Sequence, residues 1–333
     1  MFDTQVPIVA APMAGGPSTV ELASAVSEAG GFAFLAGGYK EPTALADEMA
    51  GLRARGRPFG VNLFAPGVME VETDAFAAYA QELGPEAEAH GVSLDPEPVI
   101  DDDHWEAKLR LLHADPVAVV SFTFALPGPE VVASLQSTGS RVLATITTAE
   151  EARVAQEAGV DGLIVQGAAA GGHSATLNPH RDPEDIPTSE AVARVRRQVD
   201  LPVVAAGGVD GPAAVDELLA VGARAVVVGT LLLRTDEAGT SATHRAALAD
   251  PRFDRTALTR AFTGRPARAL VNGFTERHRE APTAYPAVHH LTRELRRAAG
   301  AAGDTDRLHL WAGTGYRQAP TGPAAEVVRW LAD

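Results

Sequence analysis

Cysteine is absent from the 333-residue chain, and lysine occurs only twice, at Lys40 and Lys108. Without thiols there can be no disulfide, no thiolate nucleophile and no iron–sulfur or zinc site built on cysteine. The chain also has no G-x-S-x-G of a serine hydrolase and no G-x-x-x-x-G-K-[ST] phosphate loop, and no G-x-G-x-x-G follows the first expected strand. Its chemistry must therefore come from histidine, carboxyl groups, hydroxyl groups or a cofactor.

The chain also has few basic residues relative to acidic ones. Lysine and arginine number 28 against 43 aspartates and glutamates, which gives a net charge of −15 at pH 7 and an isoelectric point near 5.1. Binding to a nucleic-acid backbone requires a dense basic face, and these basic residues are spread along the chain. We expect no nucleic-acid partner.

Long apolar segments are the third absence. No apolar run reaches the roughly 18 residues that a membrane-spanning helix needs. The N-terminal sequence M-F-D-T-Q-V-P has neither the basic start nor the apolar core of a secretory signal. We expect a cytoplasmic protein that does not bind membranes. The hydrophobic content of 46% is enough for one large or two modest domains.

Short apolar runs rich in β-branched residues alternate with alanine-rich stretches of helical period. Eight runs are expected to form strands: Pro7–Ala11, Phe32–Ala36, Pro58–Leu63, Val117–Phe122, Arg141–Ile146, Gly162–Val165, Pro202–Ala205 and Ala225–Val228. Eight βα units predict an α/β fold of the (β/α)8 TIM-barrel type. An open doubly wound sheet would give the same local pattern, so the number of strands is what favours the barrel.

Two regions interrupt this alternation. Residues 66–116 are too long for one connection and contain acidic and proline-rich pieces, so they predict a helical insertion after the third strand. Residues 234–333 follow the eighth strand and include helical stretches and the sequence L-W-A-G-T-G-Y at Leu310–Tyr316. We expect residues 1–233 to form the barrel and residues 234–333 to form a helical extension that packs on its mouth or side.

The stretch Gln166–Ala175, which reads Q-G-A-A-A-G-G-H-S-A, directly follows the sixth expected strand. Barrel enzymes carry their catalytic groups on loops at the C-terminal ends of the strands. Gly171 and Gly172 allow a sharp turn or a close approach of the backbone to a ligand, and His173 carries an imidazole that ordinarily titrates near neutral pH. The loop is predicted to be a catalytic site.

Two more glycine clusters follow neighbouring strands. Gly207 and Gly208 come after the seventh expected strand, and Gly229 and Thr230 come after the eighth. In barrels these two loops commonly form a phosphate site from backbone amides and a helix N-terminus. They predict a phosphorylated ligand or cofactor. A phosphosugar isomerase or a non-catalytic protein that binds a phosphorylated ligand would fit these glycines equally well.

Five motifs then occur in order: A-A-P-M-A-G-G at residues 10–16, G-V-N-L at 60–63, Q-G-A-A-A-G-G-H at 166–173, A-A-G-G-V at 205–209 and V-G-T at 228–230. In these motifs the chain resembles the nitronate monooxygenase, or 2-nitropropane dioxygenase, family over about residues 6–273 and again at the late L-W-A-G. The resemblance implies a flavin mononucleotide (FMN) at the barrel mouth. It also implies the oxidation of an alkyl nitronate, such as propionate 3-nitronate, by molecular oxygen to a carbonyl compound and nitrite.

The resemblance assigns roles to individual residues. His173 matches the family's catalytic histidine, which acts beside the flavin as a base or as an electrostatic anchor for the nitronate. The implied cofactor-binding residues are Ala11, Pro12, Met13, Asn62, Gln166, Gly171, Gly172, Gly207, Gly208, Val228, Gly229 and Thr230. The first three would line one side of the isoalloxazine ring, the two amide side chains would contact the ring or the ribityl chain, and backbone amides of the others would hold the tail and phosphate.

One departure from the family concerns the substrate. Ala168, Ala169 and Ala170 stand where many members have a bulky residue and a glutamate, which leaves room for a larger or different substrate. An NAD(P)H-dependent flavin reductase, of the quinone reductase or enoyl-carrier-protein reductase type, is the first alternative on the same fold. A flavin-free barrel that binds a phosphorylated ligand is the second. The expected partners are a small nitronate and molecular oxygen, and the expected state is a monomer or homodimer.

No metal site is predicted. The acidic run Asp101–His104 is typical of solvated charge in an irregular segment. The pair His289–His290 lacks the i, i+4 spacing with which a helix presents two histidines to one metal ion.

Overall fold

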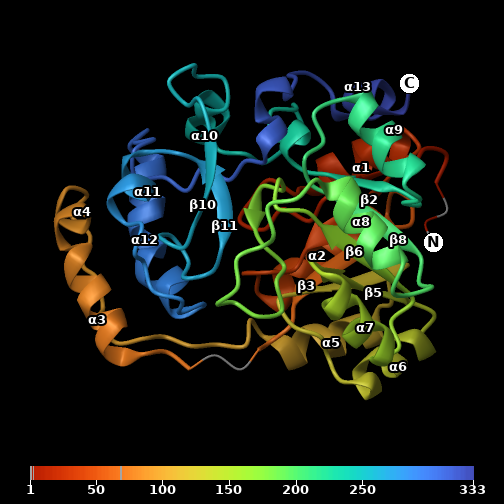
Figure 1. The fold of residues 1–333 in the computed structure, drawn as a ribbon, viewed down its shortest axis with the longest axis horizontal. Coiled ribbons are helices and arrows are strands. Elements are labelled where there is room, and N and C mark those ends of the chain that lie inside the picture. The colour runs from red at the N-terminus through yellow and green to blue at the C-terminus, as the bar shows by residue number, and fades with distance from the viewer. Residues whose placement is uncertain (1, 3, 68–69) are drawn as a thin grey trace.

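Eight parallel strands form a closed barrel at the centre of the computed structural model, which describes residues 2, 4–67 and 70–333 (Figure 1). The strands in barrel order are β1 (Ile8–Ala10), β2 (Phe32–Ala36), β3 (Gly60–Phe64), β4 (Val119–Thr123), β5 (Arg141–Ile146), β6 (Gly162–Gln166), β8 (Val203–Ala206) and β9 (Val226–Val228). β9 pairs with β1 and closes the ring. The predicted (β/α)8 barrel is confirmed, and each predicted strand overlaps an observed one.

Eight helices surround the barrel, one for each strand: α1 (Val20–Glu28), α2 (Pro42–Arg53), α5 (Trp105–Ala114), α6 (Pro129–Ser137), α7 (Ala149–Glu157), α8 (Thr188–Arg196), α9 (Pro212–Ala220) and α13 (Ala324–Ala332). Local sequence explains several helix starts. Thr19 caps α1 by accepting a hydrogen bond from the Leu22 amide at 2.9 Å, and prolines occupy the first turn of α2, α6 and α9. The last helix of the chain, α13, packs on α1, α9 and β1 and completes the ring (Figure 1).

The interior of the barrel is filled by apolar side chains, including Phe32 and Phe34. Phe2 stacks on Phe32 with a centroid distance of 4.5 Å. Ile164 and Val227 belong to the same cluster and also line the cavity at the barrel mouth. The packed interior therefore serves as the floor of the site.

A second unit, which we call the cap, is formed mainly by the chain between η1 (Thr230–Leu232) and α13. It contains α10 (Ala242–Ala247), β10 (Thr256–Thr259), β11 (Ala267–Leu270), α11 (Gly273–Arg277), α12 (Ala287–Ala301) and η2 (Thr314–Gln318). β11 pairs antiparallel with β10 and with β7 (Gly172–His173). This small sheet, which the sequence analysis did not predict, joins the cap to the histidine loop.

The insertion after β3 divides between the two units. α3 (Thr73–Glu82) and α4 (Gly84–Glu88) lie beside α11 and α12 of the cap (Figure 1). The Tyr79 hydroxyl donates to the Ala261 carbonyl at 2.6 Å. α5 falls inside the range predicted for the insertion but adds Leu109 and Leu112 to the barrel core. Residues 68 and 69 of that range lie outside the described part, and the proposed division of the chain at residue 233 stays a prediction.

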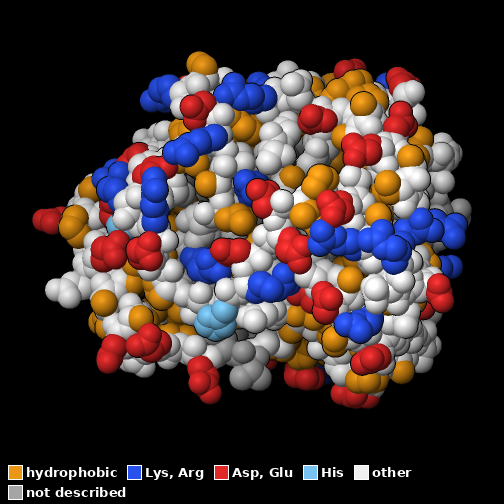
Figure 2. All heavy atoms as spheres, viewed as in Figure 1, with side chains coloured by type: hydrophobic (Ala, Val, Ile, Leu, Met, Phe, Trp, Pro, Cys, Tyr) orange, Lys and Arg blue, Asp and Glu red, His pale blue; other side chains and the backbone are white. Residues whose placement is uncertain are grey.

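Acidic and basic side chains are interspersed over the face drawn in Figure 2. Many of the charges are paired: buried Glu86 of α4, for example, lies 2.6 Å from Arg277 and 2.5 Å from Arg307. Among the described residues, no helix has the combined length and apolarity needed to cross a membrane.

Candidate active site

A cavity of about 660 Å³ opens at the C-terminal ends of the barrel strands. This volume is in the range typical of cofactor and small-molecule sites. The structure brings every predicted site residue to its lining: Ala11, Pro12, Met13, Asn62, Gln166, Gly171, Gly172, His173, Gly207, Gly208, Val228, Gly229 and Thr230. Barrel closure explains this convergence, because it places the ends of all eight strands around one opening.

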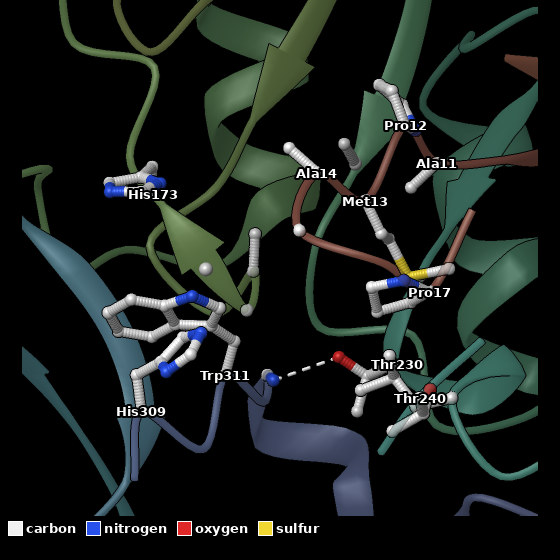
Figure 3. A pocket seen from close by; sticks show the side chains of 18 of the residues that line it. Ala11, Pro12, Met13, Ala14, Pro17, His173, Thr230, Thr240, His309 and Trp311 are labelled. Atoms are coloured by element: carbon white, nitrogen blue, oxygen red, sulfur yellow. Dashed lines mark hydrogen bonds between the residues drawn. The ribbon is translucent and has the colours of Figure 1, made fainter. Parts of the chain in front are cut away.

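The loop Ala11–Met13 forms an apolar wall across the cavity from His173 (Figure 3). Ser18 fixes this loop, since its Oγ accepts from the Met13 amide at 2.8 Å and donates to the Ala11 carbonyl at 3.2 Å. The Ala11 amide donates to the Val228 carbonyl at 2.9 Å. The wall is thus held to the neighbouring strand end before any ligand binds.

Asn62 lies at the cavity floor on β3 and is only 3% exposed. Its Oδ1 accepts hydrogen bonds from Ser121 Oγ at 2.9 Å and from Thr123 Oγ1 at 3.0 Å. Two hydroxyl donors on one side fix the orientation of the amide. Its NH2 group therefore remains to donate to a ligand in the cavity.

The glycines after β8 and β9 form an amide-lined cradle. Gly207 and Gly208 have φ values of +103° and +79°, which favour glycine. The backbone amides of Gly208, Gly229 and Thr230 donate to no other group among the described residues. Free amides on two adjacent strand ends, beside the first turn of η1, are suited to a phosphate group.

His173 lies on β7 and faces three aromatic rings. Its ring centroid is 5.5 Å from those of Phe124 and Trp311 and 5.9 Å from that of Tyr285. Its Nε2 lies 2.9 Å from Thr263 Oγ1. The pairing of His173 with Ala267 of β11 fixes the backbone beneath the ring. The imidazole is therefore held in position by the cap rather than by its own loop alone.

The surroundings of His173 favour its neutral form. Burial, followed by the positive charges of Arg265 and Arg296, lowers the pKa of His173 to about 3. Burial also lowers the pKa of each arginine to about 10, so both remain charged at neutral pH. A neutral imidazole beside two buried cations is an environment for an anionic ligand.

Gln166 connects the barrel to the histidine loop. Its Nε2 donates to the His173 carbonyl at 3.1 Å, and its Oε1 accepts from the Ala175 amide at 2.7 Å. These bonds tie the later part of the loop, at His173 and Ala175, back to the end of β6. The second Nε2 hydrogen remains for a contact in the cavity.

The alanines that depart from the family pattern lie under the C-terminal part of the cap. The Ala168 carbonyl accepts from Arg268 Nε at 2.7 Å, and the Ala169 carbonyl accepts from the Thr314 amide at 3.1 Å. A Cβ atom at Gly171 would come within 2.4 Å of the Gly313 amide nitrogen. Small residues thus let residues 312–314 lie directly on this loop.

Sequence reasoning missed several residues of the lining. Trp311 and His309 lie beside His173, and the Gly313 amide donates to Thr230 Oγ1 at 2.9 Å (Figure 3). The late L-W-A-G-T-G-Y sequence was the available signal, because its aromatic and glycine residues stood out in a helical extension. The sequence analysis expected this segment to pack on the mouth or the side of the barrel, but it did not identify these residues as part of the cavity lining.

The groups considered for a metal site are engaged elsewhere. Asp103 lies 2.8 Å from buried Lys108, and Asp101 lies 2.9 Å from His290. His289 stacks on Tyr39 with a centroid distance of 4.0 Å. Within the described residues, no group of three histidine, aspartate or glutamate side chains is placed to hold a metal ion.

Comparisons with known proteins find a family model and relatives that share one description. A family model described as nitronate monooxygenase matches residues 1–333. The chain is 37% identical over 351 residues to a nitronate monooxygenase of Pseudomonas aeruginosa, covering 100% of this chain and 97% of that protein. It is 32% identical over 335 residues to a nitronate monooxygenase of Paraburkholderia phytofirmans, covering 98% and 91%.

Solved structures agree with the fold. The nitroalkane oxidase of Streptomyces ansochromogenes superposes with a TM-score of 0.95 at 49% identity, covering 99% of this chain and 95% of that chain. FabK of Thermotoga maritima superposes with a TM-score of 0.76 at 24% identity, covering 99% and 92%. The second likeness concerns the fold alone.

Proposed function

The chain belongs to the nitronate monooxygenase family, and from this premise we propose that it uses FMN to oxidise alkyl nitronates, such as propionate 3-nitronate, with molecular oxygen. The products would be a carbonyl compound and nitrite. The observation that carries the proposal is the shared cavity, in which His173 faces an apolar wall at Ala11–Met13 and an amide cradle at Gly208 and Thr230. These are the parts that a flavin phosphate and an adjoining small substrate require.

The residues present fit FMN. The free amides of Gly208, Gly229 and Thr230 would hold the phosphate, and the fixed NH2 group of Asn62 would donate to the ring or ribityl chain. Met13 and its loop would support one face of the ring. When bound, the flavin supplies the electron acceptor for nitronate oxidation and the reductant for oxygen.

His173 would act as a neutral hydrogen-bond donor. Thr263 Oγ1 is 3.4 Å from the Arg265 carbonyl, beyond the usual O–H···O range of about 2.5–3.0 Å, but only 2.9 Å from His173 Nε2. The Thr263 hydroxyl therefore donates its hydrogen bond to Nε2. In the neutral imidazole the ring hydrogen is then on Nδ1. Nδ1–H can donate to a nitronate oxygen and orient the anion.

A role as a base toward a neutral nitroalkane fits this site less well. A group whose pKa is lowered to about 3 is a weak base at neutral pH. The positive charges of Arg265 and Arg296, which contribute to this lowered pKa, also stabilise a negatively charged ligand. We therefore propose that the substrate enters as the preformed nitronate anion and that His173 serves as its anchor.

The purified protein can test the function directly. Its absorbance spectrum should show bound flavin, and oxygen uptake should follow the addition of propionate 3-nitronate with nitrite as a product. Anaerobic mixing should bleach the flavin with the nitronate faster than with NADH. Rapid bleaching by NADH without any reaction with the nitronate would contradict the proposal.

The family similarities do not favour the two alternatives. An NAD(P)H-dependent flavin reductase remains testable through the anaerobic experiment. A flavin-free barrel would purify without a yellow chromophore and gain none on incubation with FMN. A cytoplasmic location and a monomeric or homodimeric state stay predictions.

A further inference from the structure

A second chamber of about 470 Å³ adjoins the main cavity on the side of the cap. His173, Trp311, His309 and Arg296 line both spaces, so the two cavities adjoin each other at His173. The flavin-binding loops after β8 and β9 do not line this chamber. It is therefore the side from which a substrate can meet His173.

Arg296 of α12 is buried at this junction, with 7% of its surface exposed. Its Nε donates to Thr292 Oγ1 at 3.0 Å, and its Nη2 donates to the His289 carbonyl at 2.9 Å and lies 3.2 Å from His289 Nδ1. Nη1 makes no hydrogen bond to the described residues. The edge of the guanidinium formed by Nε and Nη2 is thus fixed by the protein, and Nη1 is available to bind a ligand.

No carboxylate of the described residues lies within ion-pair distance of Arg296, although buried charges are normally paired. Arg265 likewise has no carboxylate within ion-pair distance among the described residues, but it lines neither cavity. Its guanidinium donates to the carbonyls of Thr176 and Phe124, and it lies over the Phe124 ring at 4.1 Å. Arg265 is therefore held by carbonyl groups away from both cavities, whereas Arg296 lines both and keeps an Nη1 without a hydrogen bond among the described residues.

We propose that Arg296 binds the oxyanion of the nitronate through Nη1 and determines the preference of the enzyme for anionic nitronates over neutral nitroalkanes. This inference rests on the proposed function and adds to it a residue that selects the charged substrate. The planar nitronate carries its charge on two oxygens, which suit a rigid guanidinium on one side and His173 on the other. The anion also supplies the counter-charge that the buried cation lacks.

Charge removal at Arg296 tests the proposal. In Arg296→Gln, the KM for propyl-1-nitronate should rise about 10-fold or more, while kcat/KM for 1-nitropropane should change by less than about 3-fold. Arg296→Met is a second charge-free variant, and Arg296→Lys should restore part of the nitronate affinity. Arg255→Gln is the matched control, because Arg255 is 61% exposed, pairs with Glu276 and lines neither cavity.

A binding measurement separates this inference from the proposed function. The dissociation constant of nitrite, followed by the change in flavin absorbance, should rise about 10-fold in Arg296→Gln or Arg296→Met and should be unchanged in Arg255→Gln. Flavin content and melting temperature identify variants that are folded. Folded, flavin-loaded charge-free variants with wild-type KM for nitronate and wild-type nitrite affinity would overturn the role of Arg296. A wild-type protein that binds nitrite through Arg296 but oxidises no nitronate would instead contradict the proposed function.

Discussion

Nε2 of His173 lies 2.9 Å from the hydroxyl oxygen of Thr263, a residue 90 positions later in the chain. His173 belongs to a loop of the barrel, and Thr263 belongs to the cap. The bond therefore couples the orientation of the imidazole to the docking of the cap on the barrel. Trp311, also from the cap, covers the same ring.

His173 itself can be tested by the change His173→Asn, which keeps a polar side chain but removes the imidazole. We expect turnover of the nitronate to fall about 100-fold or more, because the donor beside the reacting anion is displaced. Flavin content should stay at the wild-type level, since the proposed phosphate and ring contacts come from other loops. Near-normal turnover in a folded, flavin-loaded variant would remove the proposed role.

Thr263→Val removes the hydroxyl at nearly constant volume. We expect kcat/KM for the nitronate to fall about 10-fold, because His173 loses the bond that fixes its tautomer and orientation. Thr263→Ser keeps the hydroxyl and should restore most of the activity. Equal activity in the valine and serine variants would show that the bond does not position the imidazole.

Gly208→Val places a side chain in the proposed phosphate cradle. Even a Cβ atom there would lie 3.2 Å from the Ala169 Cβ, at a φ of +79° that side chains rarely adopt. We expect the dissociation constant of FMN, measured by fluorescence quenching, to rise at least about 10-fold. Gly139→Val is the matched control, because Gly139 also has a positive φ, of +92°, but no neighbour within 4 Å of a Cβ. It should lose stability without losing flavin affinity, and comparable flavin loss in both variants would argue against the cradle.

The pH dependence of stability should reveal the buried neutral histidines. Burial lowers the pKa of His244 to about 4 from its ordinary value of 6.5, although its hydrogen bond to the Trp311 carbonyl opposes the shift. Between these two pH values the unfolded chain binds a proton that the folded chain does not, so stability falls as the pH drops below about 6.5. His244 alone should remove about 2 kcal/mol from the free energy of unfolding at pH 5.

Denaturant titrations at pH 7.5 and pH 5 measure this loss. His244→Gln keeps a donor for the Trp311 carbonyl and removes the titration, so its stability should depend less on pH. An unchanged difference between the two pH values in that variant would exclude His244 as a source of the acid sensitivity.

The sequence by itself predicted the barrel and the residues around its mouth. Each β-strand was a short apolar run, and each glycine cluster directly followed one, so both signals were local. Once eight such units close into a barrel, the strand ends must converge, and residues as distant as Met13, Asn62 and Gly208 line one cavity. The motif order from Ala11 to Thr230 also sufficed to predict the family.

Only the tertiary structure decided how His173 is held in position and in which protonation state it lies. Thr263, Trp311 and Arg296 reach the barrel mouth through the packing of the cap. Trp311 stood in a sequence that was noticed, but no local pattern marked Thr263 or Arg296, because their contacts with the site cross long sequence distances. The sequence analysis gave His173 an imidazole that titrates near neutral pH, whereas burial and two neighbouring guanidiniums lower its pKa to about 3. A pKa depends on the solvent and charge around a group in space, and these are set by the fold.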